Sequence, residues 1–328
     1  ESYKELFTAK PYVFLDEIQN IPSWQKFARR LADTGYITMI TGSNAEMLSG
    51  EMASSLGGRY MISEIDTLTF TEYLRFNGIK TDKSSVFSGQ RFEIQRHFND
   101  YFWFGGFPEL IRFQDKKEYL NTIFQKIFLG DIIARNNIRN PNALRLMVKK
   151  LAESTMDEVS FRRIRNILLS AGISVGTATL IDYTGYFMES FLLNSIPNYR
   201  VKITERETRK KYYFSDHGLL SLFLTEPGSA MLETIVFKKL KRKYGDQVFY
   251  LRNNVELDFY IPGEAAYQIA WSVSDDQTRK REIDALIKAQ RSYKVEQMYI
   301  ITWSEEEEIK EAGHPILIKP VWKWMLEE

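Results

Sequence analysis

The stretch YVFLDE, residues 12–17, places four consecutive apolar residues directly before two acidic ones. A short run that is apolar at every position is typical of a strand buried on both faces, as in a parallel sheet. A helix-like stretch follows over residues 24–33, and a second apolar run, residues 36–40, ends in the polar residues 41–44. Strand, helix and strand in this order predict a βαβ unit, in which ligands bind outside the carboxyl ends of the strands.

The acidic pair at the end of the first strand has the chemistry needed for nucleotide hydrolysis. Asp16 can hold Mg²⁺ through its water shell, and Glu17 can orient or deprotonate an attacking water. At the end of the second strand, Thr41, Ser43 or Asn44 can hydrogen-bond that water or a γ-phosphate. The competing interpretation is that the two acids only cap a loop, because short motifs often occur by chance.

Three longer stretches resemble one known family. They are VFLDEIQNIPSWQKFARRL (residues 13–31), ITGSNAEMLSGEMASSLGGRY (40–60) and LTFTEYLRF (68–76). The family comprises archaeal and bacterial AAA-type ATPases with a C-terminal restriction-endonuclease-like domain of unknown function, of the DUF4143 type. The resemblance extends over nearly the whole chain with the segments in the same order. It implies that Asp16 and Glu17 form a Walker B motif, in which Asp16 is the Mg²⁺ partner and Glu17 the catalytic base.

The resemblance also implies a nucleotide sensor and an arginine that reaches the γ-phosphate. The sensor is one of Thr41, Ser43 and Asn44. The arginine is Arg59, for which a surface position in a glycine turn is the competing interpretation.

One part of the family pattern, a Gly-rich phosphate-binding loop ahead of the acidic strand, is not found in this sequence. Only residues 1–11 precede the strand, and the motif G-x-x-x-x-G-K-[ST] does not occur. That loop supplies the lysine and backbone amides that hold the β- and γ-phosphates. We therefore expect ATP and Mg²⁺ to be cofactors of a longer natural protein, and the present chain to bind ATP weakly or not at all.

The middle of the chain has helical periodicity interrupted by a turn at Gly105-Gly106-Phe107-Pro108. It is followed by the element order of a winged helix, three helices and a hairpin, which the resemblance implies as well. These elements are expected at residues 142–152, 161–172, 175–190, 201–204 and 211–216.

Nucleic-acid binding by this predicted winged helix requires cations, since phosphate contacts dominate the affinity. The third helix has no lysine or arginine, so it is a poor reader of the major groove. Basic residues gather instead in the predicted wing. They are Arg200, Lys202, Arg206, Arg209, Lys210 and Lys211. Nonspecific binding to the DNA backbone, contact with a protein partner and a simple solvated hairpin remain the alternatives.

The last hundred residues predict a nuclease-like domain with a degenerate site. Active members of the resembled fold place an acid on the first helix, an Asp on the second strand and Glu-x-Lys on the third. Here Gln268 stands in place of the third acid and Ala270 in place of the lysine. The residues of this degenerate site are Glu233, Glu256, Asp258 and Gln268. We expect no DNA cleavage; the alternative is a metal-dependent nuclease regulated by the ATPase, with a lysine supplied by Lys238 or Lys280.

The composition narrows the remaining possibilities. The chain has 44 basic and 43 acidic residues, which argues against a wholly polybasic nucleic-acid binder. It has no cysteine, and its three histidines are far apart in sequence. No apolar run reaches the roughly 18–20 residues needed to cross a bilayer. We expect a cytoplasmic protein with no membrane partner.

The predicted fold class is α/β. The expected domains are the distal part of a P-loop AAA core (residues 1–75), a helical lid (76–137), a winged helix (138–226) and a restriction-endonuclease-like domain (227–328). The predicted function is that of an ATP-hydrolysing switch protein.

Overall fold

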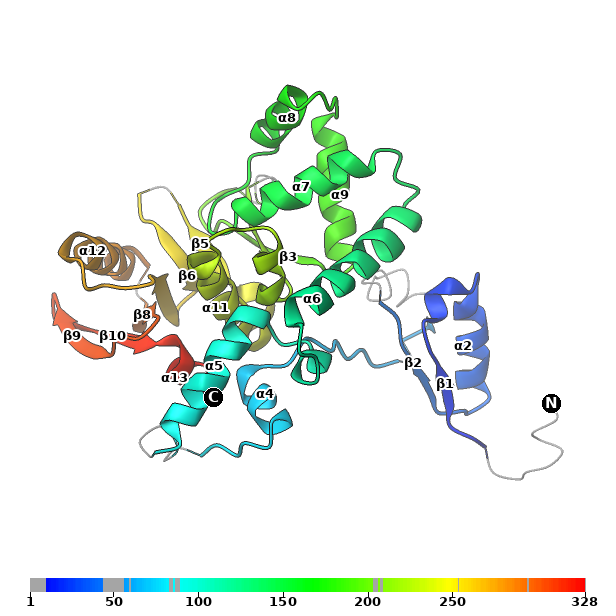
Figure 1. The fold of residues 1–328 in the computed structure, drawn as a ribbon, viewed down its shortest axis with the longest axis horizontal. Coiled ribbons are helices and arrows are strands. Elements are labelled where there is room, and N and C mark those ends of the chain that lie inside the picture. The colour runs from blue at the N-terminus through cyan, green and yellow to red at the C-terminus, as the bar shows by residue number, and fades with distance from the viewer. Residues whose placement is uncertain are drawn as a thin grey trace.

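The fold is known from a computed structural model. It describes residues 10–43, 56–58, 60–82, 85, 89–202, 206, 209–252, 254–293 and 295–327. Along the long axis of the molecule, an N-terminal unit stands at one end, helices fill the middle, and the largest sheet lies at the other end (Figure 1). The architecture is mixed α/β, as predicted.

The N-terminal unit is the predicted βαβ arrangement. Its elements are β1 (Val13–Leu15), η1 (Ile18–Asn20), α2 (Trp24–Asp33) and β2 (Thr38–Ile40). The two strands are parallel, with Phe14 opposite Met39. One face packs on α2 through a small core of Ile18, Trp24 and Ala28. Since the strands are parallel, both carboxyl ends lie at the same edge, which brings residues 16–17 next to residues 41–43.

Helices form most of the next segment. They are α4 (Phe70–Phe76), α5 (Arg91–Phe104), η4 (Pro108–Ile111), α6 (Lys116–Gln125) and η5 (Lys126–Ala134). Thr69 and Glu72 form a capping box at the start of α4, which satisfies two amides that the helix itself leaves unpaired. η5 continues directly from α6 but is π-helical, a wider turn that is rare and often found at functional sites. None of the helices in the described ranges is both long and apolar enough to span a bilayer.

Three helices and a hairpin follow, in the predicted order. They are α7 (Pro141–Glu153), α8 (Phe161–Ser170), α9 (Thr177–Glu189), β3 (Leu193–Pro197) and β4 (Lys210–Phe214). The predicted position of the first hairpin strand, residues 201–204, is wrong. Neither Val201 nor Lys202, the two residues of that stretch which the structure describes, is in a strand. The strand lies earlier because Leu193 and Ile196 are buried there and pair with β4.

The C-terminal part is built on a six-stranded sheet in the order β5-β6-β7-β8-β10-β9. Its strands are β5 (Phe249–Leu251), β6 (Leu257–Ile261), β7 (Ala265–Ile269), β8 (Gln297–Thr302), β9 (Glu307–Glu311) and β10 (His314–Pro320). The helical elements are η6 (His217–Leu222), α11 (Gly228–Tyr244), η7 (Gly245–Gln247), α12 (Asp276–Tyr293) and α13 (Val321–Trp324). The edge strand β9 was not predicted, because its run of glutamates has the composition of a solvated loop.

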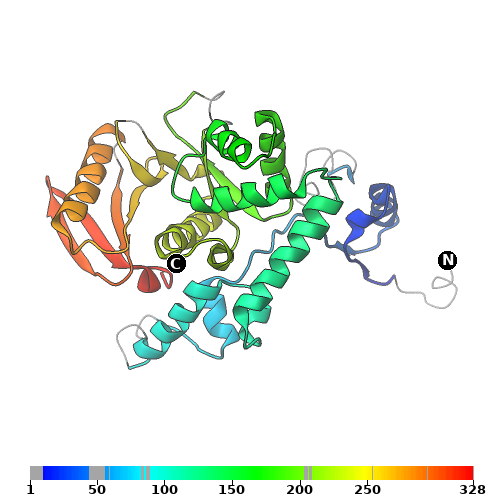
Figure 2. The ribbon, with the colours of Figure 1, turned by 45° about the horizontal axis from the view of Figure 1, so that its top comes forward.

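The two long helices of this part cover opposite faces of the sheet. Phe259 and Tyr267 share a core with α11 and the helical middle of the chain, whereas Tyr260 and Ala266 share a second core with α12. Figure 2 shows α12 on the outer side of the sheet. The inner face therefore joins the sheet to the rest of the molecule, and the polar residues on that face lie at a junction between segments.

A buried carboxylate, Asp216, connects the segment that precedes α4 to this junction. Its Oδ2 accepts hydrogen bonds from the Thr67 hydroxyl at 2.6 Å and the Gly106 amide at 2.9 Å, and Lys238 Nζ lies 3.3 Å away. Burial opposes ionisation of Asp216, but the charge of Lys238 and these hydrogen bonds outweigh it and lower the pKa to about 2. Gly218 approaches the Phe104 carbonyl so closely that a Cβ would lie 2.2 Å from its oxygen. The turn predicted at residues 105–108 is thus held against η6.

Candidate functional site

Asp16 and Glu17 directly follow β1, and both form hydrogen bonds with Thr41, which directly follows β2. The Thr41 hydroxyl donates to Asp16 Oδ1 and accepts from the Glu17 amide at 3.2 Å. Glu17 has φ 48°, in the left-handed region that non-glycine residues rarely adopt. The chain therefore turns sharply after the strand, and both carboxylates are exposed at the sheet edge.

Ser43 completes the hydrogen-bonding at this edge. Its Oγ lies 3.2 Å from Glu17 Oε2 and 3.3 Å from the Gln19 amide nitrogen. Gln19 also donates to Glu17 Oε2. Four of the six residues predicted from sequence are thus together in space: Asp16, Glu17, Thr41 and Ser43. The other two, Asn44 and Arg59, lie outside the described residues.

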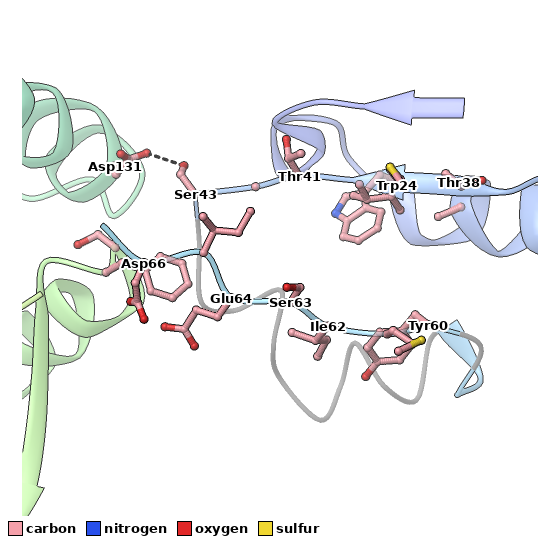
Figure 3. A pocket seen from close by; sticks show the side chains of 18 of the residues that line it. Trp24, Thr38, Thr41, Ser43, Tyr60, Ile62, Ser63, Glu64, Asp66 and Asp131 are labelled. Atoms are coloured by element: carbon pink, nitrogen blue, oxygen red, sulfur yellow. Dashed lines mark hydrogen bonds between the residues drawn. The ribbon is translucent and has the colours of Figure 1, made fainter. Parts of the chain in front are cut away.

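A large cleft of about 1260 Å³ adjoins this edge. It separates the N-terminal unit from the helical middle, and its walls come from α2, β2, the segment 60–67, η5 and residues 215–219 (Figure 3). Four carboxylates line it: Glu64, Asp66, Asp131 and Asp216. Burial raises the pKa of Glu64, and the negative charge of Asp66 raises it further. Arg29 is the one lysine or arginine among the described lining residues. A lining with so few cations is unsuited to a triphosphate, so the cleft is better described as an interface between two parts of the protein than as the phosphate site.

A second polar cluster lies inside the C-terminal junction. Glu233 on α11 and Asp258 on β6 face each other across Lys211 from β4. Lys211 Nζ is 3.1 Å from Glu233 Oε1 and 3.4 Å from Asp258 Oδ1. The side chains of Lys211 and Glu233 are 6% and 0% exposed. The Tyr213 hydroxyl donates to Glu233 Oε1 at 2.7 Å. A lysine is therefore present, although β7 supplies none.

The electrostatics of this cluster follow from burial and the short distances. Burial raises the pKa of Glu233 to about 7, against the lowering effect of Lys211. Burial by itself disfavours the charge of Lys211, but the two carboxylates outweigh it and raise its pKa. Glu233 Oε2 is buried and has no hydrogen-bond partner among the described residues.

Gln268 lies beside this cluster and acts as a connector. Its Oε1 accepts from the Asp258 amide at 3.0 Å, and its Nε2 donates to Glu282 Oε2 at 2.8 Å. Asp258 Oδ2 accepts from the Ile269 amide at 2.9 Å, so both oxygens of Asp258 have protein partners. In the described part of the chain, no group of three or more acidic or histidine side chains is arranged to hold a metal ion.

One prediction about this cluster is wrong. Glu256 was expected in the degenerate site with Asp258, but its side chain is 75% exposed and it precedes β6. The lysines named for the alternative of an active nuclease lie elsewhere: Lys238 pairs with Asp216 and Lys280 is exposed. Lys211 was missed because it belongs to a hairpin assigned to another domain. The only local signal was a lysine beside a strand-forming aromatic run.

The basic residues predicted to form a wing are largely used inside the protein. Lys211 is buried, and Arg209 Nε donates to Glu158 at 2.8 Å. Arg206 donates to the Tyr199 carbonyl at 3.1 Å. Arg200 lies over the ring of Tyr293. The contacts of Lys211 and Arg200 reach the C-terminal part, whereas Arg209 and Arg206 donate hydrogen bonds within the region of the three helices and the hairpin. Arg200 and Lys202 stay exposed, so the described cations do not form one continuous basic wing.

Comparisons with known proteins find matches for the N-terminal segment and for the middle of the chain. Residues 1–74 match the model of a family described as an AAA domain, and residues 95–228 match a domain of unknown function (DUF8612). An uncharacterized protein of Methanocaldococcus jannaschii is 33% identical over an alignment of 330 positions, which covers 96% of this chain and 74% of that protein. An uncharacterized protein of Haemophilus influenzae is 28% identical over an alignment of 321 positions, which covers 90% of this chain and 77% of that protein. The AAA match includes both strand ends of the candidate site, and the second match includes Lys211.

Proposed function

The chain belongs to the family of the uncharacterized Methanocaldococcus jannaschii protein and carries an AAA domain, and on this premise we propose that it is part of an ATP-hydrolysing switch protein. Asp16 and Glu17 are its Walker B pair, and Thr41 and Ser43 its sensor side. One observation carries the proposal: hydroxyls at the end of β2 hold both carboxylates at the end of β1. Ligands bind at such strand ends in open α/β sheets.

The residues present suit a hydrated magnesium ion. Asp16 offers a hard oxygen ligand at an exposed strand end, and the Thr41 hydroxyl engages only Oδ1 among the described contacts. Mg²⁺ bound there with ATP would neutralise charge on the transferred phosphoryl group. Glu17, one residue further and also exposed, is placed to accept a proton from the attacking water.

The experiment that tests this function is Mg²⁺-dependent release of phosphate from ATP. It needs a chain in which a phosphate-binding loop precedes residue 1, because the 328 residues contain no such motif. Hydrolysis that requires Mg²⁺ and follows saturation kinetics supports the proposal. A chain that binds ATP but never hydrolyses it, or that fails to bind it, overturns the proposal.

A second proposal concerns the C-terminal part, which we infer to be a restriction-endonuclease-like domain with a disabled site. Support comes from the order of α11, β5, β6 and β7 and from the meeting of Glu233, Asp258 and Gln268. Lys211 lies between the two carboxylates at the kind of position where a nuclease needs a metal ion. The ammonium offsets part of their negative charge, and Lys211 and the Ile269 amide occupy the two Asp258 oxygens.

We expect no nicking of supercoiled plasmid by this chain with Mg²⁺ or Mn²⁺, because metal-assisted hydrolysis needs a bound cation and an open ligand position. The readout is conversion of supercoiled to relaxed DNA, with Asp258→Ala as the matched control. Equal, background-level conversion by both proteins is the expected result. Metal-dependent nicking that disappears in Asp258→Ala would contradict it and make the nuclease the principal activity.

A further inference from the structure

The hydroxyl of Ser43 has two carboxylate neighbours and only one proton. Its Oγ is 3.2 Å from Glu17 Oε2 in the N-terminal unit and 3.3 Å from Asp131 Oδ1 on η5. Figure 3 shows Ser43 reaching across the cleft to Asp131. A serine hydroxyl donates one hydrogen bond, so at any moment it can satisfy Glu17 or Asp131, but not both.

Asp131 and Glu17 each accept a second hydrogen bond, from a neighbouring side chain. Arg135 Nη2 donates to Asp131 Oδ1 at 3.0 Å, and both side chains are partly buried. Gln19 donates to Glu17 and also to Ser43, so the Ser43 oxygen is already an acceptor. What remains free to change is the direction of the single O–H.

We propose that Ser43 is a two-position link between Glu17 and η5, and that Asp131 is a positioning residue for Glu17 that acts through Ser43. The reaction it serves rests on the ATPase function proposed above. When Glu17 turns to a water molecule, the Ser43 hydroxyl is released to Asp131. When Glu17 is idle, the hydroxyl returns and the contact to η5 weakens.

This link spans the interface between two parts of the chain. Ser43 follows β2, whereas Asp131 lies within the π-helical segment η5, 88 residues later in sequence. Segments with π-helical turns are often found at functional sites. In the described residues, the Ser43–Asp131 hydrogen bond is the direct connection from the candidate catalytic edge to the helical middle. A change at Glu17 can therefore alter η5 without moving the rest of the cleft.

The first test needs no nucleotide and uses the 328-residue chain. We expect Glu17→Ala to slow amide hydrogen exchange in residues 126–134 by about 2–10-fold, the range of one ordinary hydrogen bond, because Ser43 then donates only to Asp131. Ser43→Ala should speed exchange there, and Glu17→Ala should have no further effect in that background. Glu17→Gln, which keeps the side-chain shape, should act in the same direction but more weakly.

The matched control is Ser63→Ala, a serine lining the same cleft, which should leave exchange in residues 126–134 unchanged. The link is overturned if Glu17→Ala changes exchange equally with and without Ser43, or leaves it unchanged while Ser43 is present. Because no ATP is involved, this result is independent of the proposed ATPase activity.

The second test uses a chain that hydrolyses ATP. Asp131→Ala leaves Glu17 as the only carboxylate acceptor for Ser43, and a hydrogen bond to a carboxylate lowers its basicity. We expect kcat to fall about 2–10-fold with KM unchanged, and no further fall when Asp131→Ala is added to Ser43→Ala. Additive effects of the two substitutions contradict the link. If the parent hydrolyses no ATP, the ATPase proposal fails while the exchange result still decides the link.

Discussion

Replacing Glu17 with glutamine in an ATP-hydrolysing form of the protein is expected to preserve nucleotide binding and to lower turnover by about 10²–10⁴-fold. Glutamine keeps the size of the side chain and can still accept a hydrogen bond from Ser43. It cannot take a proton from water. ATP affinity should change little, because Glu17 lies beyond the proposed Mg²⁺ partner Asp16 and adds no cation to bind phosphate.

The measurement pairs steady-state ATP hydrolysis with binding of a fluorescent ATP analogue. Asp33→Asn is the matched control, since it also neutralises an acid in the N-terminal unit but lies at the far end of α2. The control should hydrolyse ATP at the parent rate. A Glu17→Gln variant with the parent rate would show that Glu17 is not the base, and loss of binding together with turnover would point to misfolding.

Much of the fold was predictable because the deciding signals are local. The apolar run that ends in Asp16 and Glu17 predicts a parallel strand, and the pairing of β1 with β2 confirms it. The predicted burial on both faces is wrong, because Phe14 is 70% exposed and the small core lies on the other face, against α2. Ser160, directly before α8, is a residue type typical of helix N-caps, and its side chain accepts a hydrogen bond from the Arg163 amide. Such caps and periodicities depend on residues within a few positions of one another, so one sequence suffices to recognise them.

The parts that could not be predicted depend on contacts between distant segments. Nothing near Lys211 in the sequence indicates two carboxylates 22 and 47 residues away. Likewise, Asp131 has no local pattern that links it to Ser43. The first hairpin strand was misplaced because Val201-Lys202-Ile203-Thr204 has good strand propensity, whereas burial of Leu193 decides the pairing. Strand position follows packing more than propensity.

Replacing Lys211 with methionine is expected to destabilise the protein by about 3–5 kcal/mol, the usual cost of leaving a buried charge without its partner. Methionine has nearly the length of the lysine stem, so packing against the hairpin is largely kept. The loss is therefore electrostatic: Glu233 and Asp258 remain close together with no cation between them. Adding Glu233→Gln to Lys211→Met removes one of the two carboxylates and should restore more than half of the stability.

The destabilisation by Lys211→Met should also depend on pH, and the pKa of Glu233 determines whether it grows or shrinks as pH rises. In the parent, the pKa of Glu233 is raised from 4.5 to about 7, so its contribution to stability falls as pH rises between these values. Lys211 lowers the pKa of Glu233, so without Lys211 this pKa rises further. The loss of stability with rising pH then continues above pH 7. The pKa of Lys211 itself is raised above 10.5, so in the parent its stabilising contribution is fully present throughout this range. Below pH 7 both proteins lose stability at the same rate, so the deficit of Lys211→Met should be nearly constant between pH 5 and 7 and larger at pH 8, by at most about 1.4 kcal/mol.

Urea denaturation followed by circular dichroism at these pH values measures the effect. Lys288→Met, at an exposed lysine on α12, is the control and should unfold like the parent at all of them. A deficit that is the same at all of these pH values would show that Lys211→Met disturbs packing instead of charge. In that case Lys211 would not be the cation that balances Glu233 and Asp258, and the explanation offered for an inactive nuclease-like site would lose its basis.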